Sequence, residues 1–171
     1  MDKETLKNKE IIYHPIGIVH SPHKERGKAP VQPIYADGFK GYLEIFPEFA
    51  PGLESLEIFS HIFVLFHFHQ ARSFKLKLVP FFHSTERGIF TTRAPERPNP
   101  IGLSLLRLEK IEGNRVYVND LDILDGTPIL DIKPFTRGLD SREKSRDGWI
   151  GRVDPEEAKE KGRRANKEAD S

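Results

Sequence analysis

The chain has 171 residues and a formal net charge of +1, with 27 Lys and Arg against 26 Asp and Glu. This length suits one domain with its own core, and the absence of cysteine excludes disulfides, thiolate zinc sites and cysteine nucleophiles. The start of the chain lacks the apolar core of a signal peptide, and the longest apolar run, residues 62–66, is too short to span a bilayer. We therefore expect a cytoplasmic protein without membrane contact, in which any nucleic-acid partner meets a local basic patch.

The N-terminal part of the chain alternates apolar segments with turn residues. Residues 11–19 and 41–46 predict two strands, and Pro15 and Gly17 place the first strand at a sheet edge or bend it. Between the two strands, residues 21–32 form a loop rich in Pro, Gly and Lys. Such a loop cannot bury its backbone, so it either wraps the surface or walls a pocket.

Residues 61–69 have the most strand-like pattern in the chain. The even positions of this stretch are all apolar, which predicts one buried face made of Ile62, Val64, Phe66 and Phe68. The opposite face carries three histidines, His61, His67 and His69. The preceding residues, 53–59, predict one or two helical turns.

Further short strands follow, with turn residues between them. Residues 101–111 and 115–119 are joined by Glu-Gly-Asn and predict a hairpin. The other predicted strands are residues 75–80, 88–92 and 128–132. Near-regular spacing of short strands favours a mainly β fold, a closed or nearly closed antiparallel barrel with few short helices. We assign this barrel to residues 11–139.

The composition changes after residue 139. Residues 140–153 mix basic residues with Trp149 and Ile150, which predicts a segment that docks on a neighbouring element. Residues 154–171 contain almost no apolar side chain, so we expect a charged tail that is a frayed helix or disordered.

Residues 91–104 are stiff and polar at once. Three prolines within six residues fix the backbone and remove N–H donors, which leaves carbonyl groups free to face a ligand. Arg93 and Arg97 are planar donors that suit a carboxylate or a phosphate. Gly102 permits another backbone or a ligand to approach closely. This segment is therefore either a pocket wall or a rigid surface turn.

A second polar cluster, residues 124–135, contains Asp125 on a predicted tight turn. Its carboxylate either accepts hydrogen bonds from ribose hydroxyls or an exocyclic amine, or satisfies its own backbone. S-adenosyl-L-methionine suits the two clusters together. Its carboxylate fits Arg93, its ribose fits Asp125, and its sulfonium prefers carbonyls and ring faces to lysines.

Two other functions remain open from the residues alone. His67 and His69 lie on one strand face and could ligate a metal with His83 and a carboxylate, as in a metal-dependent barrel enzyme, although they could equally line a pocket. A non-catalytic RNA-binding module is the other alternative, with a backbone-contacting patch formed by Arg72, Lys75, Lys77 and Arg87. No Gly-rich dinucleotide fingerprint or phosphate loop follows any predicted strand.

At these clusters the sequence resembles the TsaA-like (YaeB/TrmO) family of S-adenosylmethionine-dependent tRNA methyltransferases. The resemblance covers about residues 13–135. Its most specific marks are Arg97-Pro98-Asn99-Pro100-Ile101-Gly102 and Asp125-Gly126-Thr127-Pro128. It implies a homodimeric antiparallel barrel that binds the methyl donor outside any Rossmann fold and has no metal. It further implies methylation at N6 of N6-threonylcarbamoyladenosine, in the anticodon loop of tRNA.

The resemblance also implies the site residues. Those expected to bind the methyl donor are Pro30, Val31, Gln32, His69, Gln70, Arg93, Leu103, Leu124, Asp125, Gly126, Thr127 and Pro128. For the substrate, our own choice from the residues is Arg97, Asn99 and Lys133. The chain departs from the family pattern at Val31, where arginine is common, and at Phe135, where tyrosine is common.

The expected reaction is an in-line methyl transfer driven mainly by positioning. The target nitrogen carries an acyl group, so its lone pair is delocalised and its proton must leave. A base within hydrogen-bond reach is therefore expected. His69, Asp131 and a group of the substrate itself all remain candidates.

Overall fold

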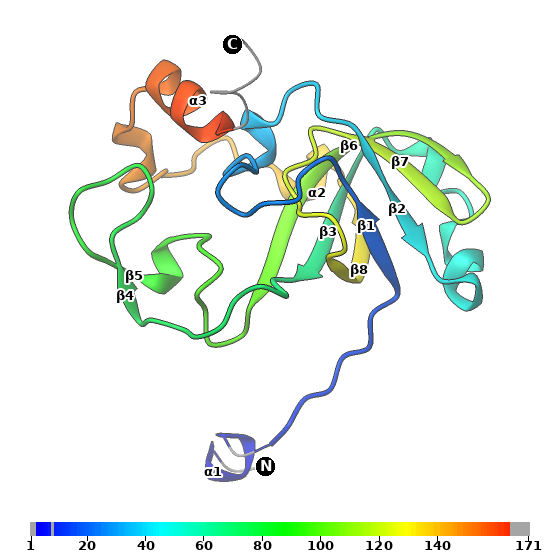
Figure 1. Cartoon of the computed structure of the whole chain (residues 1–171), viewed down its shortest axis with the longest axis horizontal. Coiled ribbons are helices and arrows are strands. Elements are labelled where there is room, and N and C mark those ends of the chain that lie inside the picture. The colour runs from blue at the N-terminus through cyan, green and yellow to red at the C-terminus, as the bar shows by residue number, and fades with distance from the viewer. Residues whose placement is uncertain (1–2, 8, 165–171) are drawn as a thin grey trace.

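The structure, a computed structural model, describes residues 3–7 and 9–164 (Figure 1). In this part of the chain, six strands close into an antiparallel barrel in the order β1-β2-β7-β6-β3-β8. Their bounds are β1 Gly17–His20, β2 Gly41–Ile45, β3 His61–His67, β6 Ile101–Glu112, β7 Arg115–Asn119 and β8 Pro128–Pro134. The prediction of a mainly β fold built on an antiparallel barrel is confirmed, as is the hairpin of β6 and β7.

The other elements are short and lie outside the barrel. A two-stranded ribbon of β4 (Lys77–Leu78) and β5 (Arg87–Gly88) extends from the barrel as an arm, which is green in Figure 1. The α-helices are α1 (Lys3–Lys7), α2 (Arg137–Asp140) and α3 (Pro155–Arg163). Single 3-10 helices cover Pro33–Tyr35, Pro47–Leu53, Leu56–Ile58, Ile89–Thr91 and Ile150–Arg152. No described helix has both the length and the apolar character needed to cross a membrane.

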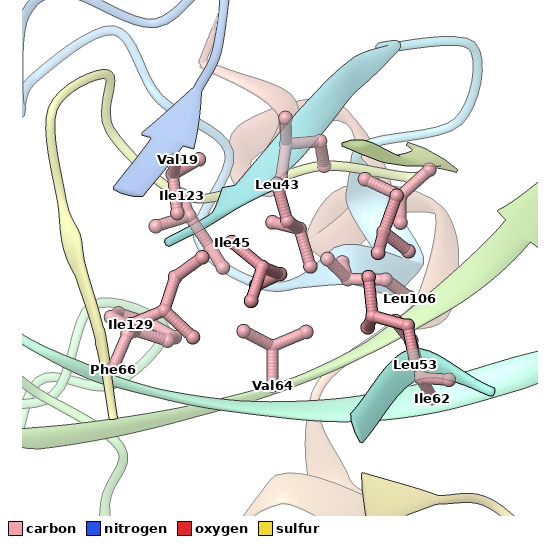
Figure 2. Packing of buried hydrophobic residues seen from close by; sticks show 13 residues of the cluster. Val19, Leu43, Ile45, Leu53, Ile62, Val64, Phe66, Leu106, Ile123 and Ile129 are labelled. Carbon is pink, nitrogen blue, oxygen red and sulfur yellow. The ribbon is translucent and has the colours of Figure 1, made fainter. Parts of the chain in front are cut away.

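The core lies inside the barrel, where the inward side chains of all its walls meet (Figure 2). From β3 it receives Ile62 and Val64, both with no exposed surface, and Phe66 at 5% exposure, as the alternation predicts. Val19, Leu43, Leu106 and Ile129 complete the same cluster. Truncation of such a side chain to alanine costs about 2–5 kcal/mol of unfolding free energy.

The predicted strand of residues 75–80 shortens to β4, Lys77–Leu78, and two other predicted strands also differ from the structure. The first begins only at Gly17, because Pro15 removes one ladder donor, and Ile11 and Ile12 upstream are 68% and 67% exposed. In the second, residues 89–91 form a 3-10 helix instead of extending β5. There the hydroxyl of Thr91 donates to the carbonyl of Gly88, which favours the tight turn over a ladder.

The C-terminal region also differs from the expected tail. Residues 155–163 form α3, which packs against the 3-10 helix Pro33–Tyr35. Asp154 caps the helix by accepting from the N–H groups of Glu156 and Glu157 at 3.1 and 2.9 Å. The helix docks through small residues, since Ala158 and Gly162 are its buried positions. An apolar stripe was therefore not needed for docking, and residues 165–171 lie outside the described residues.

Candidate functional site

A cleft of about 1350 Å³ opens at one end of the barrel. The end of β3, the start of β6 and the connection from β7 to β8 form its barrel side. Residues 26–37, the loop of residues 92–97 and the C-terminal region form the outer walls. Pockets for single small ligands usually have about 300–1,000 Å³, so this cleft has room for a cofactor and part of a second molecule.

The cleft brings together most of the residues that the sequence predicts for the site. From the methyl-donor set, those that line it are Pro30, Val31, Gln32, His69, Gln70, Arg93, Leu103, Leu124 and Thr127, and Arg97 joins them from the substrate set. These positions are far apart in the sequence. Barrel closure places β3 beside both β6 and β8 and so gathers them.

Asp125, Gly126 and Pro128 do not line the cleft. One carboxylate oxygen of Asp125 accepts from the Ser21 N–H at 2.9 Å, and the other lies 2.6 Å from Lys24 Nζ. Burial tends to raise the pKa of Asp125, but the bonds from Lys24 and Ser21 lower it overall. Gly126 takes a positive φ of 74° in the same turn, and Pro128 pairs with Ile18 in the barrel. The Asp125 carboxylate is thus bonded by Ser21 and Lys24 of another loop, which is neither of the two roles expected from the sequence.

Two predicted substrate residues also lie outside the lining of the cleft. Asn99 is exposed, and its backbone carbonyl accepts from the Ile101 N–H at 2.7 Å. Lys133 is exposed on β8, where its Nζ lies 2.7 Å from Asp131. Asp131, one of the candidate bases, is likewise on β8 and does not line the cleft.

Two arginines organise residues 91–104, which we call the proline loop, in different ways. Arg93 donates from Nη1 to Gln32 Oε1 at 2.8 Å, which ties the loop to the opposite wall of the cleft. Arg97 donates from Nη1 to the carbonyls of Thr92 and Ala94 at 2.8 and 3.4 Å. Arg97 therefore fixes the loop with one nitrogen and also lines the cleft. Its Nε and Nη2 make no hydrogen bond with the described residues.

Gly102 has the close contact that the sequence predicts, but with a side chain. A Cβ atom at this position would lie 2.2 Å from the ring of Phe66. Because Gly102 and Phe66 pair across β6 and β3, the ring packs flat on the glycine and shapes the cleft wall that both line.

His69 lines the cleft as a neutral side chain. Its Nδ1 lies 3.2 Å from the hydroxyl of Thr127. Burial, followed by the charge of His67, lowers the pKa of His69 below its ordinary value. His83 is engaged elsewhere, since its Nδ1 accepts from the Thr85 N–H and its ring packs edge-on against Trp149. The described residues hold no group of three or more His, Asp or Glu that could bind a metal ion.

The prediction from sequence missed Asp122, which also lines the cleft. The hydroxyl of Ser104 donates to its carboxylate at 2.7 Å. Burial raises the pKa of Asp122 to about 7, against the opposing effects of the Ser104 bond, its own backbone N–H and the charge of Arg93. A signal was present in the sequence, because an acid flanked by the apolar residues Leu121 and Ile123 is unusual.

The C-terminal region supplies an outer wall that was not expected from sequence. The N–H of Val31 donates to the carbonyl of Gly162 at 2.8 Å. The guanidinium of Arg164 lies 4.2 Å from the centre of the Phe81 ring, and both residues line the cleft. Trp149, from the predicted docking segment, donates from its indole nitrogen to the carbonyl of Thr91 at 2.9 Å.

Comparison with known proteins assigns this arrangement to a family. Residues 18–141 match the model of the tRNA-methyltransferase O N-terminal domain. The S-adenosyl-L-methionine-binding protein of Archaeoglobus fulgidus is 44% identical over 130 residues, which are 76% of this chain and 93% of that protein. The tRNA (adenine(37)-N6)-methyltransferase of Homo sapiens is 36% identical over 146 residues, 81% of this chain but only 33% of that enzyme.

A solved structure agrees with these sequence matches. The crystal structure of TrmO from Pseudomonas aeruginosa superposes with a TM-score of 0.70 at 39% identity. The match covers 82% of this chain and 63% of that one, so this chain is similar to about two thirds of a longer protein. The chain belongs to the tRNA-methyltransferase O N-terminal domain family.

Proposed function

We propose that this chain is an S-adenosyl-L-methionine-dependent tRNA methyltransferase that methylates N6 of an adenine beside the anticodon, and that its substrate is N6-threonylcarbamoyladenosine. One observation carries the proposal. The barrel gathers nine of the twelve residues expected to hold the methyl donor, together with Arg97, around one cleft. The relatives named above are described as binding this cofactor and as methylating this position of tRNA.

The groups that line the cleft fit S-adenosyl-L-methionine. Bound there, this cofactor supplies a methyl group on a positively charged sulfonium. Arg93 is placed to bind its carboxylate, and the proline loop offers carbonyl oxygens rather than ammonium groups to the sulfonium. Aromatic faces for its base come from Phe68, Phe81 and Phe82, which line the same cleft. The main contribution of these residues to rate is orientation.

Arg97 is our choice for the threonyl carboxylate of the substrate. Its Nη1 holds the proline loop, which fixes the guanidinium plane and aims the other donors at a ligand in the cleft. A planar, pre-oriented guanidinium suits a carboxylate better than a flexible lysine. The backbone N–H of Lys75 donates to the carbonyl of Glu96 at 3.2 Å, so an exposed cation lies beside this loop for the RNA backbone.

We also propose that the protein acts as a homodimer in the cytoplasm. The arm formed by β4, β5 and their flanking loops exposes large apolar side chains: Phe74, Leu76, Val79 and Phe90, at 55%, 62%, 56% and 77%. A second copy of the chain would remove this surface from water. Sedimentation that gives only monomer at micromolar concentration, with full activity, would contradict the dimer. Lack of cysteine suits a reducing compartment.

Cofactor binding is the first test. At a ligand concentration near 100 times Kd, native-state binding stabilises a protein by about 2.7 kcal/mol. For a chain of this size, the melting temperature rises by roughly 5–10 °C. S-adenosylhomocysteine should produce this shift, and zinc ions or a chelator should not. A shift with zinc alone would favour the metal-dependent alternative. If the protein binds RNA but neither S-adenosyl-L-methionine nor S-adenosylhomocysteine raises its melting temperature, the non-catalytic RNA-binding module is favoured.

A further inference from the structure

Four carboxyl side chains line the cleft among the described residues, and their surroundings differ. Asp37 is exposed at the rim. Glu96 is paired with Arg26, and Asp120 lies 3.5 Å from Arg107. Asp122 is half-buried, and within the described part of the chain no cation lies within 4.0 Å of it. It is therefore a cleft carboxyl that is partly shielded from water and has no ion-pair partner among the described residues.

The proposed reaction needs a group of this kind. The N6 atom of the substrate is bonded to an acyl carbon, so it is weakly basic and carries one hydrogen. When the new N6–CH₃ bond forms and the S–CH₃ bond breaks, this hydrogen must leave as a proton. A base held inside the cleft accepts it without exposing the reacting atoms to water.

We propose that Asp122 is the catalytic residue that accepts the N6 proton during methyl transfer. The inference deepens the proposed function and rests on it. One carboxylate oxygen accepts from the hydroxyl of Ser104, and the carboxylate has further lone pairs that can accept from the substrate N–H. The products are the N6-methylated nucleoside, S-adenosylhomocysteine and protonated Asp122, which then gives its proton to water.

The basicity of Asp122 suits this role. An ordinary aspartate, with a pKa near 3.8, is a weak base, whereas burial raises the pKa of Asp122 to about 7. A base with a pKa near the working pH combines a useful ionised fraction with the largest driving force for proton uptake. The opposing influences come from Ser104 on β6 and from Arg93 on the proline loop. The other titratable side chains that line the cleft are Arg26, Tyr35, Asp37, His61, His69, Glu96, Arg97, Asp120, Lys159 and Arg164.

The other candidate bases are placed less well. His69 lines the cleft, but burial lowers its pKa, which makes it a weaker proton acceptor. Asp131 is bonded to Lys133 and to the Ile132 N–H, and it lies outside the lining of the cleft. Asp122 is thus favoured over His69 by proton affinity and over Asp131 by position.

The variant Asp122→Asn keeps the shape and the Ser104 partner but removes proton affinity. Single-turnover methyl transfer to tRNA should fall by about 10²- to 10⁴-fold. Affinity for S-adenosylhomocysteine, measured by calorimetry, should stay within about threefold, since a catalytic base contributes to the transition state rather than to cofactor binding. Asp131→Asn, a matched change outside the cleft, should retain the wild-type rate.

Two pH measurements test the assignment without relying on loss of activity. Because the Ser104 bond lowers the pKa of Asp122, Ser104→Ala should move the acidic limb of the rate profile to higher pH. In the wild type at pH 7, S-adenosyl-L-methionine should release up to about half a proton more than S-adenosylhomocysteine on binding, because only the former brings a positive charge near Asp122. Asp122→Asn should abolish this difference.

Several outcomes would overturn the assignment. Near-wild-type rates in Asp122→Asn, or a fall in the Asp131→Asn rate instead, would exclude Asp122 as the base. A loss of cofactor affinity of more than tenfold in Asp122→Asn would make it a cofactor contact. If Asp122→Asn does not fold, the pH–rate profile of Ser104→Ala and the proton release of the wild type test the assignment. An unshifted acidic limb together with equal proton release by the two nucleosides would exclude Asp122 as the base. Failure of the wild type to methylate any tRNA would instead contradict the proposed function.

Discussion

The N–H of Val31 donates a hydrogen bond of 2.8 Å to the carbonyl oxygen of Gly162, across almost the whole length of the chain. Val31 belongs to the loop expected to hold the methyl donor, and Gly162 belongs to α3, which lies beyond the family match at residue 141. In Figure 1 the red helix α3 lies next to this blue-to-cyan loop. The barrel alone therefore does not complete the cleft, and α3 holds one of its walls in position.

Replacing Gly162 should disturb this wall. In Gly162→Ala the new Cβ would lie 2.5 Å from the ring of Tyr35, so the helix must move away from the loop. We expect the affinity for S-adenosylhomocysteine to fall about three- to tenfold, because the closed wall becomes only a fraction of the population. Gly138→Ala is the control, since this helical glycine has nothing within 4 Å of an added Cβ. Unchanged affinity in Gly162→Ala would show that α3 does not support the cleft.

The proline loop gives a second prediction, in which substitutions of two of its residues have different effects on cofactor binding. Arg93 lines the cleft and bonds Gln32, whereas Asn99 is exposed outside it. Arg93→Ala should weaken cofactor binding by about 10- to 100-fold, as expected for the loss of a charged hydrogen bond. Asn99→Ala should leave the cofactor-induced rise in melting temperature intact. Equal effects of the two changes, measured by calorimetry, would contradict this placement.

The sequence predicted the parts of the fold that follow a simple period. Alternation identified the buried face of β3, and turn residues identified the hairpin of β6 and β7. A helix was one of the two alternatives predicted for residues 154–171, but the docking of α3 escaped prediction because its buried positions, Ala158 and Gly162, are small and carry no apolar pattern. Its contact depends on the shape of Tyr35, which is distant in sequence.

The sequence predicted those site residues whose residue type alone suggests a role. It missed or left open those residues whose role depends on a neighbour in the folded chain. Arg93 and Arg97 have few functions on a stiff loop other than binding or bracing it, and they do line the cleft. Asp125 had two possible roles, and only the folded chain shows that Lys24 and Ser21 occupy its carboxylate. Asp122 gained its properties from burial beside Ser104, because the chain that follows β7 continues alongside β6.

His23 predicts how stability depends on pH. Its Nε2 lies 2.8 Å from the Leu121 carbonyl, and burial lowers its pKa below 6.5 although this hydrogen bond opposes the shift. The unfolded chain then binds the proton more readily than the folded chain, so the unfolding free energy falls as the pH drops below about 6.5. In urea titrations between pH 5 and 7.5, His23→Gln should show a shallower fall than the wild type. A parallel pH dependence would refute the assignment.

Salt should separate RNA binding from cofactor binding. The cations expected to contact the RNA backbone are Arg72, Lys75, Lys77, Arg87, Arg97, Lys133, Arg137 and the basic run of residues 142–146. Phosphate contacts release counterions, so the apparent affinity for tRNA should fall steeply between about 50 and 200 mM salt. In a plot of log affinity against log salt concentration, each contact should make the slope more negative by about 0.7–0.9. S-adenosylhomocysteine affinity should change little over the same range. Changing exposed Lys77 to Ala should lower the slope for tRNA by about one contact.

The most direct test of the proposed function is methyl transfer from S-adenosyl-L-methionine to tRNA prepared with and without the threonylcarbamoyl group, read by nucleoside mass spectrometry. We predict N6-methylation of threonylcarbamoyladenosine in the modified tRNA and no methylation of the same position in the unmodified one. The reason is that Arg97, the cation fixed on the proline loop, has its carboxylate partner only in the modified base. Equal methylation of both tRNAs, or none of either by protein that binds S-adenosylhomocysteine, would contradict the proposed substrate.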